Sequence, residues 1–129
     1  MYAAGLDAEL SIAFGKKDEV SSVTAGGKYA KTVTKLYETL PADSANIRNI
    51  LLTGYSSYAG TMCSDTLSEA VKIEAMRGWM DLQERVSELV LSTRAVNESL
   101  DAALSDTSSD AWSEVDGAVE RFAEARSML

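Results

Sequence analysis

Residues 66–105 read TLSEAVKIEAMRGWMDLQERVSELVLSTRAVNESLDAALS, and this stretch decides the fold class. Apolar and small residues recur in it at steps of three and four, which places them on one stripe of an α-helix. The stripe consists of Val71, Ala75, Trp79, Leu82, Val86, Leu89, Thr93, Val96, Leu100 and Ala103. Met76 and Met80 widen it, as is typical of a helix inside a bundle. Thr66 and Glu69 have the spacing of a capping box, so the pattern predicts one long helix over 66–105.

A last helix is predicted over 109–129, after the polar break at residues 105–110. Its apolar residues again follow helical spacing. They are Trp112, Val115, Val119, Phe122, Ala125 and Leu129. Because the break is short, we expect the last two helices to be antiparallel neighbours.

Upstream of these helices, Pro41 divides the chain, because proline disfavours helix at the residue before it and lacks a backbone donor. Asp43 or Ser44 can then cap a helix over 44–63. The residues expected to face inward in this helix are Ile47, Ile50, Leu51, Gly54, Tyr58 and Met62.

The first 40 residues carry an apolar stripe in a single helical phase. This predicts a helix over about 2–40, with a possible break near residue 15. Gly15 and the pair Gly26–Gly27 each cost about 1 kcal/mol relative to alanine within a helix. Whether the helix continues through these glycines is left open.

Together these patterns predict an all-α chain: a single domain over 1–129, folded as an antiparallel four-helix bundle with one or two long helices. Helices of about 39 residues would reach about 58 Å and those of about 20 residues about 30 Å. Two short helices cannot cover two long ones everywhere, so an apolar face would remain for a partner protein or a second copy. We expect this interaction surface to include Leu6, Leu10, Phe14, Met76 and Met80.

Charge is unevenly distributed along the chain. Residues 1–64 carry six basic and six acidic side chains, whereas residues 65–129 carry six basic and fourteen acidic ones, which gives the net charge of −8. The acidic half would repel phosphate, so we expect neither nucleic-acid binding nor attraction to an anionic membrane. No run of 18 apolar residues could cross a membrane. The N-terminus lacks the basic region of a signal peptide, and a cytoplasmic protein and an extracytoplasmic fragment are both compatible with the sequence.

The residues that most often carry chemistry are scarce. The chain has no histidine and one cysteine, Cys63, which excludes histidine-based catalysis and histidine-ligated metal sites. Cys63 has no histidine to activate it and is expected to be structural. We therefore expect no catalytic residues, no metal and no cofactor, and predict that the chain is not an enzyme.

Two functions fit these features. The first is a non-enzymatic interaction or assembly module that acts through apolar helix faces, either by docking a protein partner or by self-association as a homodimer or larger coiled-coil-like oligomer. The alternative is the extracytoplasmic ligand-binding domain of a membrane receptor, a sensor. In a sensor the candidate ligand contacts are Arg77, Arg85, Arg94, Tyr55 and Tyr58.

Overall fold

The computed structural model describes the backbone of residues 2–106 and 109–129, and the side chains of residues 4–106 and 110–129. This part of the chain holds six helices and no strand, so the all-α class is confirmed, whereas the antiparallel four-helix bundle is not. Residues 107–108 of the predicted polar break lie outside the described residues. The helices are α1 (Tyr2–Gly15), α2 (Lys17–Thr24), α3 (Ala30–Thr39), α4 (Ala45–Met62), α5 (Glu69–Ser105) and α6 (Ser109–Ser127).

The segment 2–40, for which the sequence pattern leaves one long helix and a broken helix both open, forms three helices, and the possible break near residue 15 is confirmed. At that break the Lys16 backbone N–H bonds the Ala13 carbonyl at 3.2 Å, three residues back. The Tyr37 hydroxyl donates to the same carbonyl at 2.7 Å. These two donors take the place of the regular helical bond and fix the change in direction.

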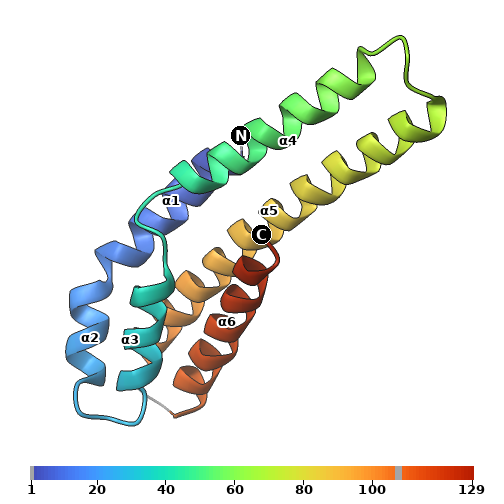
Figure 1. Cartoon of the computed structure of the whole chain (residues 1–129). Coiled ribbons are helices and arrows are strands. Elements are labelled where there is room, and N and C mark those ends of the chain that lie inside the picture. Colours follow the sequence, from blue (N-terminus) through green and yellow to red (C-terminus); the bar gives the residue numbers. More distant parts are fainter. Residues whose placement is uncertain (1, 107–108) are drawn as a thin grey trace.

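The second break separates α2 from α3, so the helix does not continue through Gly26 and Gly27. Gly26 has φ of 70°, a left-handed conformation that glycine adopts without steric cost. The Gly27 N–H then bonds the Thr24 carbonyl at 3.0 Å and closes the turn. As a result α2 and α3 form a helical hairpin (Figure 1).

Helix α4 begins within one residue of the predicted start. Leu40 is extended in front of Pro41, as predicted, and α4 begins directly after Ser44. The Ser44 backbone N–H donates to the Asp7 carboxylate of α1 at 2.9 Å, so a residue distant in sequence satisfies this helix start.

The start of α5 differs from the predicted one by three residues. The helix begins at Glu69, and Ser68 rather than Thr66 is its N-cap. The Ser68 hydroxyl accepts the Val71 backbone N–H at 3.3 Å. The predicted Thr66–Glu69 capping box is therefore wrong, because the serine inside it caps the helix instead.

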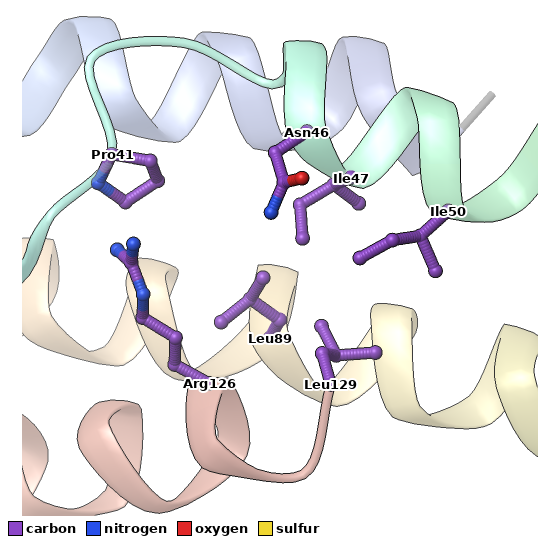
Figure 2. Close-up of a pocket in the computed structure, with 7 residues that line it drawn as sticks. All are labelled: Pro41, Asn46, Ile47, Ile50, Leu89, Arg126 and Leu129. Atoms are coloured by element: carbon purple, nitrogen blue, oxygen red, sulfur yellow. The ribbon is translucent and has the colours of Figure 1, made fainter.

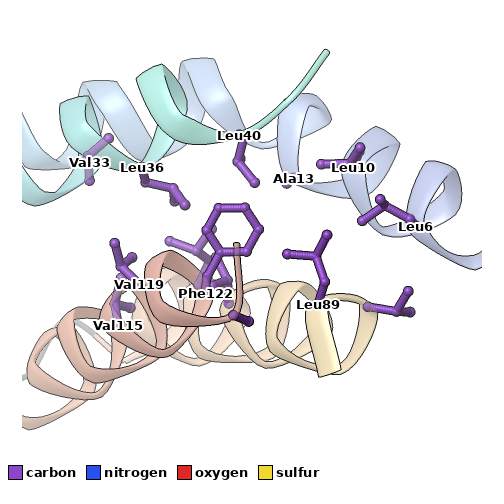
Figure 3. Close-up of a cluster of buried hydrophobic side chains, with 14 of the residues drawn as sticks. Leu6, Leu10, Ala13, Val33, Leu36, Leu40, Leu89, Val115, Val119 and Phe122 are labelled. Atoms are coloured by element: carbon purple, nitrogen blue, oxygen red, sulfur yellow. The ribbon is translucent and has the colours of Figure 1, made fainter. Parts of the chain in front are cut away.

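Helix α5 organises the molecule, since α1, α4 and α6 all pack against it (Figure 1). Its C-terminal half, with α1, α2, α3 and α6, forms the part that we call the body. Phe122 of α6 lies at the centre of the body core, facing Leu36, Leu40 and Leu89 (Figure 3). Every residue of the predicted α6 face is buried except Leu129, which is partly buried.

The remainder of α4 and α5 projects from the body as a helical hairpin (Figure 1). We call residues 49–82 the arm. No side chain from Arg48 to Arg85 is fully buried, and the buried residues of α5 begin at Val86. The apolar stripe of α5 is thus continuous, but only its C-terminal half is enclosed.

Candidate interaction surface

The two helices of the arm are antiparallel and meet through aromatic and small residues. Tyr58 stacks on Trp79 with ring centroids 6.1 Å apart, and Tyr55 lies edge-on to the same indole at 5.6 Å. Gly54 permits the close approach of α4, because a Cβ atom there would overlap the Leu82 Cδ2 atom. These contacts form the inner seam of the arm.

A second set of apolar residues in the arm is exposed to one side of this seam, and Tyr55 belongs to both sets. On α4 they follow at steps of three and seven residues, and on α5 at steps of three and four, so each set forms a helical stripe. Their exposed fractions lie between 37% and 59%. We call this set the open face, and it consists of Leu52, Tyr55 and Met62 of α4 with Ile73, Met76 and Met80 of α5.

Both stripes of the open face lie on the same side of the arm. Each residue of an α-helix is rotated by about 100° from the one before it. Tyr55 directly follows Gly54 of the inner seam, and Met80 directly follows Trp79. Because α4 and α5 are antiparallel, an equal rotation in each helix turns both side chains towards the same side. The open face is therefore one surface that spans two helices.

In the body, α1 lies on α5 next to the side that carries the open face. Gly5 of α1 lies against Val90 of α5, and a Cβ at Gly5 would be 3.6 Å from a Val90 methyl group. Further along, Lys16 bonds Asp101 at 2.8 Å, so α1 runs parallel to α5. At about 100° per residue, Val90 stands about 20° from Trp79 of the inner seam and about 80° from Met80 of the open face. Helix α1 therefore covers α5 between the inner seam and the side that carries the open face.

Polar contacts hold α1 firmly on the body half of α5. The Asn97 side chain, 4% exposed, donates to the Glu9 carbonyl at 2.8 Å and to the Glu9 carboxylate at 3.0 Å. Arg94 lies 3.4 Å from the same carboxylate, and Lys16 donates to the Asn97 carbonyl at 3.0 Å. The six residues of the open face are all apolar or aromatic, and Glu84 lies beside Met80 at the body end of that face.

The α4 side of the arm is also uncharged. Residues 49–64 contain no acidic or basic side chain, although most of them are exposed. Solvent-facing helices ordinarily carry charge on their outer side. An exposed helical segment without any charge is suited to being covered by another polypeptide.

The predicted interaction residues divide between the core and this surface. The structure buries Leu6 and Leu10, at 0% and 2% exposure, so neither is accessible to a partner; this corrects their place in the predicted surface. They are buried because α1 packs inward against α5 and the body core. Phe14 is partly buried against Tyr37, with ring centroids 5.9 Å apart. Met76 and Met80 lie on the open face.

The candidate ligand contacts are not brought together. Arg85 pairs with Asp81 at 3.1 Å and donates to the Met128 carbonyl at 2.8 Å, while Arg94 pairs with Glu9. Arg77 is exposed on the arm, about 26 Å along the helix from Arg94. Tyr55 and Tyr58 pack on Trp79 and belong to the arm. No shared cage for a small acid results from this placement.

A small pocket lies where the α3–α4 connection meets α5 and the end of α6 (Figure 2). Its volume is about 110 Å³, well below the several hundred Å³ of typical ligand sites. Ile47, Ile50, Leu89 and Leu129 give it an apolar lining, and Arg126 closes one side by donating to the Thr39 carbonyl. The pocket has the character of a packing defect at a helix junction.

Among the described residues, Tyr37, Glu88 and Arg121 have shifted pKa values, and none of them lies on the arm. Burial raises the pKa of Tyr37 to about 12, so its hydroxyl is a donor and not a base at neutral pH. The hydrogen bond from Arg121, at 2.8 Å, lowers the pKa of Glu88 and joins α6 to α5. Within the described residues there is no group of three potential metal ligands, and none of the described helices is long and apolar enough to span a membrane.

Comparison with protein-family models, with curated proteins and with solved structures finds no match to this chain. A function for this chain is therefore inferred from the exposed surface described above.

The sequence pattern missed half of the open face. It placed Met62 inward on α4 and did not single out Leu52 or Ile73. The signal that identifies the α4 side is the absence of charge over residues 49–64, which periodicity alone does not register.

Proposed function

We propose that this chain is a non-enzymatic interaction module that binds another polypeptide through the open face of its arm. The observation that carries the proposal is the contrast along α5. Its apolar stripe is buried from Val86 onward, whereas in the arm the stripe packs only on α4, and Ile73, Met76 and Met80 beside it are 40–55% exposed. Exposed apolar surface shared between two helices is typical of protein–protein contact sites.

The side chains of the open face support this proposal. Three of the six are methionine or isoleucine on α5, and α4 contributes an aromatic residue, Tyr55. Methionine adapts its shape to a partner, and tyrosine is enriched at interfaces. Without histidine, and with Tyr37 protonated at neutral pH, the chain offers little for acid–base catalysis, so the proposal is a binding function.

The sensor alternative has less support. It needs cationic groups that converge on one ligand, but Arg85 and Arg94 are engaged within the chain. It predicts that a small carboxylic acid raises the unfolding temperature, whereas the proposed function predicts no such shift.

Site-specific photo-crosslinking tests the proposed function. A photoreactive amino acid replaces Met80 on the open face or Leu91, an exposed residue of α5 outside the arm, as the matched control. Both proteins are irradiated in purified form and in an extract of source cells. We expect a saturable crosslink to one defined polypeptide, a copy of the chain or another protein, from position 80 only, and its loss when Met76 is changed to Lys. Equal labelling from both positions, or none from position 80, would overturn the proposal.

A further inference from the structure

We propose that the occupant of the open face is the same face of a second copy of this chain, with the two arms antiparallel. The inference rests on the proposed function and names its partner. Two arms joined in this way form a four-helix bundle between two molecules, with α4 and α5 from each.

The first argument is the number of helical layers. Stable helical folds bury apolar stripes between at least two layers, but the arm is a single layer of two helices. Its inner seam joins α4 to α5 and leaves the open face without a cover. A second arm supplies a layer of the same width, length and composition. Arms facing each other across a two-fold axis meet through identical surfaces, which is the usual arrangement of a homodimer.

The second argument concerns orientation. Helix α1 lies on α5 next to the side that carries the open face, so it bounds that face at its body end. If two arms were parallel, their α1 helices would meet in the same space. In the antiparallel arrangement the tip of each arm points towards the α1 end of its partner. This arrangement also keeps apart the two bodies, whose separation matters because each chain carries a net charge of −8.

The third argument is the available area. A full large side chain has an area of about 150–200 Å². The six side chains of the open face are each about half exposed, so together they present on the order of 500 Å² of apolar surface per arm. Two arms would bury on the order of 1,000 Å² in total, at the lower end of the range for specific complexes. The dimer is therefore expected to be reversible, with dissociation in the micromolar range.

Absolute mass in solution tests the inference directly. We expect light scattering behind a sizing column to show the mass rising from that of one chain to that of two as the concentration increases. The double variant Met76→Lys with Met80→Lys should raise the dissociation constant by at least about tenfold, a loss of about 1.4 kcal/mol. Lysine makes the net charge of each chain less negative, so the overall repulsion between the two chains does not increase. Leu91→Lys, which makes the same kind of change outside the arm, should associate as the wild type does.

The native thiol reports the orientation. Cys63 is exposed at the tip of α4, about six residues from the centre of the open face. A spin label on Cys63 should give an inter-label distance of about 20 Å for antiparallel arms, since six residues on each side span about 18 Å along the arm. Arms that lie parallel would bring the labels to about 10 Å, the interaxial spacing of packed helices, and would overturn the inference.

The outcomes separate this inference from the proposed function. Circular dichroism first establishes that each lysine variant keeps its helix content, and Leu52→Lys offers a second disruption from α4. A chain that stays monomeric at every concentration, or a dimer insensitive to Met76→Lys, Met80→Lys and Leu52→Lys, would overturn the second copy as occupant. The proposed function would still stand if position 80 crosslinks to a different polypeptide, and would fall if it crosslinks to none.

Discussion

At the scale of single residues, Tyr37 shows how one buried polar group shapes the fold. Its hydroxyl donates to the Ala13 carbonyl at the end of α1, and its ring packs against Phe14. This single side chain from α3 therefore holds the bend between α1 and α2. Burial at this position raises its pKa from 10.0 to about 12.

The pH dependence of stability follows from that shift. A pKa that is higher in the folded state means that the folded chain holds the proton more tightly, so the stabilisation is complete below pH 10 and is lost as the pH rises through about 12. We expect the free energy of unfolding of the wild type to fall more steeply over this window than that of Tyr37→Phe. At neutral pH the variant should lose about 1 kcal/mol with the hydrogen bond.

Urea denaturation of both proteins at a series of pH values measures this difference. Tyr55→Phe is the matched control, because the Tyr55 side chain is largely exposed. Parallel profiles for the wild type and Tyr37→Phe would contradict the assignment of a buried, tightly held proton.

At the scale of helices, the breaks are decided by backbone conformation more than by hydrophobic pattern. Residues 2–40 keep one apolar phase, and the pattern alone is compatible with one rod. The turn at Gly26 interrupts it because the left-handed conformation lets α3 fold back on α2. The ends of α4 and α6 were predictable to within about two residues, because proline and polar breaks mark them.

Two glycine substitutions should have opposite effects. Gly26→Ala forces a side chain into the left-handed region and should destabilise the chain by about 1 kcal/mol. Gly60 lies inside α4 with open space around its Cβ position, so Gly60→Ala should stabilise by up to about 1 kcal/mol through helix propensity. Urea denaturation followed by circular dichroism measures both. A stabilising Gly26→Ala would mean that the α2–α3 turn is not left-handed.

At the scale of the whole molecule, the sequence predicted which residues are apolar but not what covers them. The α5 stripe was recognised along its entire length, and the structure encloses only the part from Val86 onward. Likewise, Leu6 and Met80 both belong to apolar stripes, yet one is in the core and the other is on the surface. Periodicity describes one helix at a time, whereas burial depends on how the other helices fold around it.

Local stability should differ along this one helix. In dilute, monomeric protein we expect amide hydrogen exchange to be faster in α5 before Leu82 than after Val86, because the arm encloses no residue completely. Mass spectrometry of peptides from the two halves measures the rates. Raising the protein concentration should slow exchange in the arm alone. Uniform exchange along α5 in dilute solution would contradict the division into body and arm.

The unbroken course of α5 through both parts makes it a lever. The helix is about 55 Å long, and its C-terminal half is fixed by α1 and α6 while its other end is held only by α4. The arm tip lies about 26 Å beyond the last enclosed turn, so a tilt of about 5° at the body moves the tip by about 2 Å. A small tilt of α5 in the body is thus enlarged at the arm tip, and a force on the tip acts on the contacts of α5 with α1 and α6.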